Sequence, residues 1–278
     1  MSMHVVPALW NTHVRSYECD RYRHVNNAVY IEYITEATLD AWSGIADADW
    51  RMKKLSAEYR APAVRGDRLL VSGWPMGNAG EEGASIRCGY AIRKNNEAEP
   101  IARAEVVWRL YDRTLGMVVT LPEPWPVLER RESDLLRPDR NGRDPVDGRW
   151  YRYSHTIGSH EVGGGGTVDA AQILRCVEDA RVCACADAGW ENSRLAAENF
   201  LSVQIRHEAE FLHDLCLGDR IVVRSRVCDL GRLRGTWEHR FERDGELVAR
   251  DFSTGAFLNR DGRLAKPPEK LMEDLVAN

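Results

Sequence analysis

Residues 20–30 read Asp-Arg-Tyr-Arg-His-Val-Asn-Asn-Ala-Val-Tyr. In this segment a carboxylate (Asp20) stands four residues before an imidazole (His24), and two asparagines follow the next residue. An apolar pattern with helical spacing begins at the end of the segment. The segment therefore predicts a reactive loop that leads into a helix. Such a loop is suited to polarising a carbonyl group and delivering water to it.

A long helix is predicted directly after this loop. Tyr30, Tyr33, Ile34, Ala37 and Ala41 fall at positions i, i+3, i+4, i+7 and i+11. Residues at this spacing share one face of a helix, so we expect this face to pack against a core.

A second helix with a similar apolar stripe is predicted far downstream. Ile173, Val177, Ala180 and Ala184 repeat the helical spacing, and Asp169 stands where an N-cap would be. The chain therefore carries two comparable helices, which suggests a duplication.

An internal repeat supports this interpretation. Gly66-Asp-Arg-Leu-Leu-Val71 returns as Gly218-Asp-Arg-Ile-Val-Val223, and Ile101-Ala-Arg103 returns as Val248-Ala-Arg250. Each of these segments leads into a run with strand character. Several matches in one order predict two copies of the same unit.

Each copy reads as a short strand (12–18 and 151–157), a loop, a long helix and then several strands. This pattern predicts an α+β fold in which each copy wraps an antiparallel sheet around a central helix. The expected boundaries are an N-terminal domain at 1–130, a linker at 131–148 and a C-terminal domain at 149–278. The linker is expected from its charge, prolines and glycines.

Composition narrows the classes of protein that the chain can belong to. Of its 278 residues, 44% are hydrophobic and 29% are charged, which is typical of a globular protein. The net charge of −5 argues against a nucleic-acid partner. No apolar run reaches the roughly 18 residues of a membrane span. Seven cysteines without a regular spacing, and no visible signal peptide, predict free thiols and a cytoplasmic location.

The motif Asp20-x-x-x-His24-Val-Asn26-Asn27 resembles the signature of hotdog-fold thioesterases of the 4-hydroxybenzoyl-CoA thioesterase superfamily. Its nearest likeness is to acyl-ACP thioesterases, in which a Glu-Tyr-Arg segment follows in the next strand. Glu58-Tyr59-Arg60 stands at the corresponding place in this chain.

Together with the repeat, the resemblance implies a tandem double hotdog. It also implies catalytic roles for three residues. Asp20 matches the family's catalytic aspartate, His24 its histidine and Glu58 its second carboxylate. Tyr22 occupies the place of the family's catalytic asparagine, and its hydroxyl or Asn27 could orient the substrate or water instead.

The same residues also have structural interpretations. Asp20 could form a turn or a helix cap, and Asn26 and Asn27 could cap the helix. The backbone amides near Asn27 and Ala28 could donate to an oxyanion. The candidate substrate-binding residues are Tyr22, Asn26, Asn27 and Ala28.

Glu58 likewise has a structural alternative. It could be a strand residue that pairs with Arg60 or Arg65 on a solvated face.

The second copy is expected to be degenerate at this site. Alignment of the two helices places Gly163 under Asp20 and Thr167 under His24. Asp169 and Glu210 fall under Asn26 and Glu58, where capping and strand roles are the simpler interpretations.

The predicted function is hydrolysis of an acyl-CoA or acyl-ACP thioester, with Asp20 as base or nucleophile and with no metal or other cofactor. One active site per chain is expected, in a monomeric pseudo-dimer or a homodimer without nucleic-acid or membrane partners. Two alternatives stay open: a non-catalytic acyl-thioester binder or accessory protein, and a hotdog hydratase or dehydratase.

Overall fold

The computed structural model describes most of the chain, namely residues 8–42, 48–79, 85–94, 97–112, 117–118, 146–163 and 165–276. The predicted linker at 131–148 lies outside the described residues, except for residues 146–148. The chain divides into two compact units. The first comprises Met1–Arg137 with Asp169–Ala171, and the second comprises Pro138–Val168 with Gln172–Asn278.

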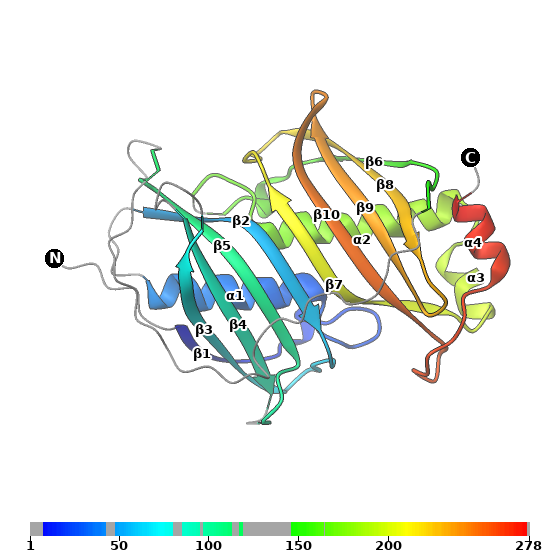
Figure 1. Cartoon of the computed structure of the whole chain (residues 1–278), viewed down its shortest axis with the longest axis horizontal. Helices are drawn as coiled ribbons and strands as arrows, with labels where there is room; N and C mark the ends of the chain where they lie inside the picture. Colours follow the sequence, from blue (N-terminus) through cyan, green and yellow to red (C-terminus); the bar gives the residue numbers. More distant parts are fainter. Residues whose placement is uncertain are drawn as a thin grey trace. The chain divides into compact units, whose positions relative to one another are not determined.

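The first unit is an antiparallel sheet with one long helix across it (Figure 1). Its strands lie in the order β1-β3-β4-β5-β2. Its elements are β1 (Ala8–His13), the 3-10 helix η1 (Ser16–Glu18), α1 (Asn27–Ala41), β2 (Ala48–Tyr59), β3 (Arg68–Asn78), β4 (Ser85–Lys94) and β5 (Ala102–Asp112).

The second unit repeats this plan, with strands in the equivalent order β6-β8-β9-β10-β7. Two further helices, α3 and α4, have no counterpart among the described elements of the first unit. Its elements are β6 (Tyr151–Thr156), η3 (Ser159–Glu161), α2 (Ala170–Asp187), α3 (Asn192–Ala197), β7 (Leu201–Phe211), β8 (Arg220–Leu230), β9 (Arg234–Arg243), β10 (Glu246–Leu258) and α4 (Glu269–Val276). The predicted α+β tandem of two hotdog units is confirmed.

The first strand of each unit ends earlier than predicted. β1 spans Ala8–His13, whereas the sequence predicted a strand at 12–18, so the two share only residues 12 and 13. The reason is local, because the Arg15 amide donates to the Glu18 carboxylate at 2.5 Å and turns the chain into η1. In the second unit, β6 ends at Thr156 and a corresponding 3-10 turn follows.

The apolar stripes of both central helices are buried as predicted. In α1, Tyr30, Tyr33, Ile34 and Ala37 are buried, and Ala41 at the end of the helix is half-buried. The stripe of α2 is buried too, at Ile173, Val177, Ala180 and Ala184. Helical periodicity was therefore sufficient to orient both helices on their sheets.

A hydrogen-bonded tyrosine joins α1 to its sheet. The Tyr90 hydroxyl lies 2.8 Å from the Thr38 hydroxyl of α1 and accepts a hydrogen bond from Trp108 Nε1 at 2.8 Å. All three side chains are buried. Because polar groups in such a core need partners, this contact fixes how the helix sits on strands β4 and β5.

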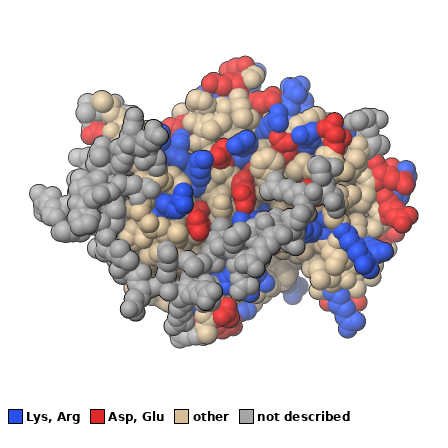
Figure 2. All heavy atoms as spheres, in the orientation of Figure 1, with Lys and Arg blue, Asp and Glu red and all other residues tan. Residues whose placement is uncertain are grey.

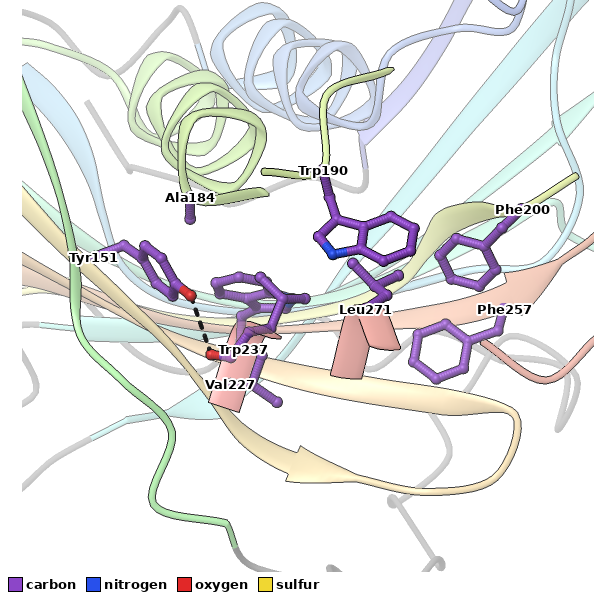
Figure 3. Close-up of a cluster of buried hydrophobic side chains, with 9 residues drawn as sticks. Tyr151, Ala184, Trp190, Phe200, Val227, Trp237, Phe257 and Leu271 are labelled. Carbon is purple, nitrogen blue, oxygen red and sulfur yellow. Dashed lines mark hydrogen bonds between the residues drawn. The ribbon is translucent and has the colours of Figure 1, made fainter. Parts of the chain in front are cut away.

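The short helix α4 packs on the core of the second unit, and Figure 3 shows its Leu271 among the side chains of a buried cluster. Leu271 and Leu275 of this helix pack in a buried cluster with Trp190, Trp237 and Phe257. The sequence interpretation did not anticipate α4, since it is short and lies beyond the last strand.

The surface carries mixed charge. Figure 2 shows cationic and anionic side chains interspersed over the drawn face. Cross-strand ion pairs of the second unit include Arg226–Glu238 at 2.9 Å and Arg224–Glu242 at 3.1 Å. None of the described helices is both long and apolar enough to cross a bilayer. All seven cysteines are free thiols.

The tyrosine contact gives a first prediction. Tyr90→Phe should lower the free energy of unfolding by about 1–3 kcal/mol, because the buried indole N–H of Trp108 loses its acceptor. Urea denaturation measures this change. Tyr17→Phe is the control, because Tyr17 is 79% exposed and its loss should have almost no effect. Equal effects of the two variants would contradict the assigned role of Tyr90.

Candidate active site

Backbone hydrogen bonds fix the loop that carries Asp20 and His24. The Asp20 amide donates to the His24 carbonyl at 2.7 Å, and the Arg23 amide donates to the Asp20 carbonyl at 2.9 Å. The Val25 amide donates to the Ala63 carbonyl at 2.9 Å, which ties the loop to the segment after β2. The loop is therefore a closed turn anchored at the start of α1.

The Asp20 carboxylate is partly used by this turn. Its Oδ1 accepts from the Tyr22 amide at 2.8 Å and from the His24 amide at 3.1 Å. The predicted structural role of Asp20 is thus present in the molecule. Within the described part of the chain, the Asp20 side chain forms these two hydrogen bonds, and both use Oδ1. Asp20 is half-buried, so its Oδ2 is available to a ligand.

His24 lies in the same turn and is exposed. Its backbone pairs with Val64 in an isolated bridge, while its imidazole has no hydrogen-bond partner among the residues that the structure describes. The structure therefore brings Asp20 and His24 into one short loop and leaves the imidazole accessible.

The two asparagines have different positions at the start of α1. Asn26 is the N-cap, and its Oδ1 accepts from the Ala28 amide at 2.9 Å. Asn27 is the first helical residue, and its carbonyl accepts from the Tyr59 hydroxyl at 3.3 Å. The capping role predicted for Asn26 is present. The Ala28 amide, a candidate oxyanion donor, is engaged by that cap.

Tyr22 lies at the surface, where its side chain is 45% exposed. Its hydroxyl accepts from Arg21 Nη2 at 2.8 Å, and the Arg21 guanidinium lies 4.8 Å from the ring centroid. The hydroxyl that could replace the family asparagine is therefore held by the neighbouring arginine.

Glu58 lies on the face of the sheet that is turned away from α1. Its neighbour Tyr59 faces α1, as shown by its contact with Asn27 and by its ring at 5.6 Å from that of Tyr30. Successive strand residues point to opposite faces, so Glu58 points away from α1. Its carboxylate accepts from Arg103 Nη1 at 3.4 Å. The structure thus pairs Glu58 with Arg103 of β5, not with Arg60 or Arg65, and does not place it in the Asp20 loop.

The second unit contains the same strand pair. Glu210 of β7 lies opposite Arg250 of β10, and their side chains form an ion pair at 2.8 Å. Glu58 and Arg103 occupy the equivalent register positions in β2 and β5. Because the pair persists in the unit that has glycine and threonine in place of Asp20 and His24, it is a property of the sheet.

A buried carboxylate just before the loop was missed from the sequence. Glu18 accepts from the Arg15 guanidinium at 2.8 Å and from the Tyr33 hydroxyl at 2.8 Å. Burial raises the pKa of Tyr33, and the Glu18 carboxylate raises it further. The internal repeat could have revealed Glu18, because Glu161 ends the corresponding 3-10 helix of the second unit.

The second unit keeps the loop but has neither a carboxylate nor an imidazole at the positions of Asp20 and His24. The Gly163 amide donates to the Thr167 carbonyl at 3.0 Å, and the Gly166 amide donates to the Gly163 carbonyl at 3.0 Å. The Val168 amide donates to the Leu215 carbonyl at 2.8 Å. These bonds correspond one by one to those of the first loop, so the predicted placement of Gly163 under Asp20 and Thr167 under His24 is confirmed.

One residue of the first loop has an unfavourable backbone conformation. Arg23 has a φ of 63°, and its counterpart Gly166 has a φ of 80°. A left-handed conformation is easy for glycine and costs other residues free energy. The first loop therefore holds strain at the turn between Asp20 and His24, as functional loops often do.

The fold and this loop define the class: a tandem hotdog protein with the motif of a thioester hydrolase. Residues 7–110 match the model of the acyl-ACP thioesterase C-terminal domain, although they form the first unit here. Residues 160–275 match the model of the thioesterase-like superfamily. Since both halves match thioesterase models, the chain belongs to the hotdog thioesterase superfamily.

Individual relatives agree with this family. The chain is 36% identical over 70 residues to the long-chain acyl-CoA thioesterase FadM of Escherichia coli; the match covers 21% of this chain and 51% of FadM. It therefore spans about half the length of that curated relative.

Solved structures share the fold across both units. One is described as a putative oleoyl thioesterase from Lactobacillus plantarum, with 11% identity and a TM-score of 0.68 over 92% of this chain and 98% of that one. Another is the 12:0-ACP thioesterase of Umbellularia californica, with 13% identity and a TM-score of 0.66 over 91% and 94%. These similarities concern the fold alone.

The strained turn gives a second prediction. Arg23→Gly should raise the free energy of unfolding by about 0.5–1 kcal/mol, because relief of the left-handed conformation exceeds the entropy cost of glycine. Arg21→Gly is the matched control. It should lower the free energy of unfolding, because Arg21 does not have a positive φ and glycine there only adds an entropy cost. Urea denaturation of both variants measures the difference. The same sign for both would contradict the strain at Arg23.

Proposed function

We propose that this chain is an acyl thioesterase that hydrolyses an acyl-CoA or acyl-ACP thioester at the Asp20–His24 loop. One observation carries the proposal. Two loops share the same backbone hydrogen bonds, and only the first presents a carboxylate and an imidazole. A loop that served folding alone would not need them, because Gly163 and Thr167 support the same turn.

Asp20 supplies the chemistry in one of two ways. Its carboxylate attacks the thioester carbonyl, so that the C–S bond breaks, a thiolate leaves and water then hydrolyses the acyl anhydride. Alternatively, it removes a proton from water, and the hydroxide attacks the same carbonyl. His24, exposed in the same turn, orients the water or delivers a proton to the leaving thiolate.

The start of α1 favours the negative charge that develops on the carbonyl oxygen. α1 begins at Asn27, directly after the loop, and helix N-termini carry a partial positive charge. The Ala28 amide could donate to this oxyanion only after the Asn26 side chain releases it. In this proposal Asn26 caps the helix, and Asn27 and Tyr22 border the substrate.

The proposal extends to the whole chain. Residues 1–130 carry the one active site, and residues 149–278 form a unit without hydrolytic residues in its loop. The substrate is an acyl-CoA or an acyl-ACP, and the protein acts in the cytoplasm as a monomeric pseudo-dimer or a homodimer.

A non-catalytic acyl-thioester binder is the second candidate. It is favoured by the Asp20 side chain, whose Oδ1 accepts two amides of its own turn. Such a protein would bind acyl-CoA and release no thiol with any acyl chain. A thiol-release screen across short, medium, long and aromatic acyl-CoAs distinguishes the two candidates.

The third prediction concerns Asp20. Asp20→Asn keeps an oxygen that accepts from Tyr22 and His24 but removes the carboxylate, so turnover should fall roughly 10²–10⁴-fold with the fold intact. The measurement is thiol release with the best substrate of the screen, next to a thermal melt. Asp169→Asn, directly before α2, is the control and should keep full activity. Unchanged hydrolysis in Asp20→Asn would overturn the proposal.

The fourth prediction separates the two roles considered for Glu58. Glu58→Gln should change kcat/KM by less than about tenfold and lower the free energy of unfolding by about 1–3 kcal/mol, because Arg103 is buried and loses a charged acceptor. Glu210→Gln is the matched variant and should also keep activity. A loss of activity in Glu58→Gln as large as that of Asp20→Asn, with Glu210→Gln active, would assign Glu58 to catalysis.

A further inference from the structure

We propose that His155, Glu161 and Cys176 of the second unit bind one Zn²⁺ ion. Their ligand atoms all lie within 4.8 Å of one another. His155 Nε2 lies 2.8 Å and 2.9 Å from the two carboxylate oxygens of Glu161. The three residues come from β6, η3 and α2, so the fold, and not a local sequence motif, brings them together.

The ligand set fits zinc. Zn²⁺ binds imidazole nitrogen, thiolate sulfur and carboxylate oxygen at about 2.0–2.3 Å, most often with tetrahedral geometry. Tetrahedral ligands at these bond lengths stand roughly 3.3–3.8 Å apart. Small side-chain rotations would bring the three groups to this spacing. Glu161 and Cys176 are buried, and His155 is half-buried and provides the open side of the site.

Comparison with the first unit supports a cation at this place. There the equivalent carboxylate, Glu18, is neutralised by the permanent charge of Arg15 and accepts from the Tyr33 hydroxyl. In the second unit Glu161 has His155 as its partner, and Cys176 takes the place of Tyr33 on the central helix. The duplication has thus exchanged a guanidinium and a phenol for two groups that bind metals.

The charges around the cluster also favour a cation. Burial acts to raise the pKa of Glu161, but the Gly158 amide and the His155 imidazole outweigh it, so this pKa lies below its usual range and the carboxylate is ionised. Asp179 adds a second nearby carboxylate. Burial raises the pKa of the Cys176 thiol to about 12. Zinc binding would displace the thiol proton and compensate the charge of the thiolate.

The site would join the first strand, the turn and the central helix of the second unit. It is separate from the proposed hydrolysis, because its equivalent in the first unit is the Arg15–Glu18–Tyr33 cluster and not the Asp20 loop. Failure of the zinc proposal therefore leaves the proposed function untouched.

The test uses the full chain, treated with a chelator and kept reduced. Calorimetric titration with Zn²⁺ should show one ion per chain, and the melting temperature should rise by a few degrees at saturating zinc. Co²⁺ in place of zinc should give a thiolate-to-cobalt charge-transfer band. Cys176→Ser should abolish this band, and Cys176→Ser and His155→Gln should each weaken zinc binding at least tenfold.

Matched controls address other thiols and histidines. Cys183→Ser changes a half-buried thiol of the same helix, and His213→Gln changes a solvent-exposed histidine that lies 3.4 Å from Glu246. Both variants should bind zinc like the unaltered protein.

Two results would overturn the proposal. One is the absence of zinc binding or of the charge-transfer band in the unaltered protein, a result that holds whether or not Cys176→Ser folds. The other is a folded Cys176→Ser variant with unchanged affinity. Either result would leave His155 and Glu161 as an ion pair that replaces Arg15 and Glu18.

Discussion

The backbone hydrogen bond that closes the loop before each central helix is the constraint on which both units depend. It joins the Asp20 amide to the His24 carbonyl at 2.7 Å in the first unit, and the Gly163 amide to the Thr167 carbonyl at 3.0 Å in the second. Because main-chain groups form it, the loop keeps its shape when its side chains change. The loop can therefore have a carboxylate and an imidazole in one unit and lack both in the other without loss of the fold.

Comparison of the two units therefore separates residues that maintain the fold from residues that could serve a reaction. Features present in both units, such as the Glu58–Arg103 and Glu210–Arg250 pairs, stabilise the sheet. Features present in one unit alone mark specialisation, and the Asp20–His24 loop is the clearest of them. The strain at Arg23, where the other copy has glycine, is confined to this loop as well.

Local patterns in the sequence predicted much of the fold. The burial of the two helical stripes, the repeat and the register of the two loops followed from spacing along the chain. The partner of Glu58 did not, because Arg103 lies on another strand and strand pairing is set by the whole sheet. The cluster of His155, Glu161 and Cys176 was missed for the same reason, since no short spacing joins its members. β1 ends early because the Glu18 carboxylate accepts a hydrogen bond from the Arg15 amide. The strand propensities of the residues give no information on such a contact.

In the proposed function, Asp20 and His24 perform the hydrolysis, and the backbone hydrogen bonds of the loop maintain the fold. The most direct measurement is thiol release from acyl-CoA by the double variant Asp20→Gly with His24→Thr, which gives the first loop the residues of the second. We expect a folded protein that melts a few degrees lower, because the two hydrogen bonds to the Asp20 carboxylate are lost, and that shows no thiol release above background. Hydrolysis at the original rate by this double variant would contradict the proposed function.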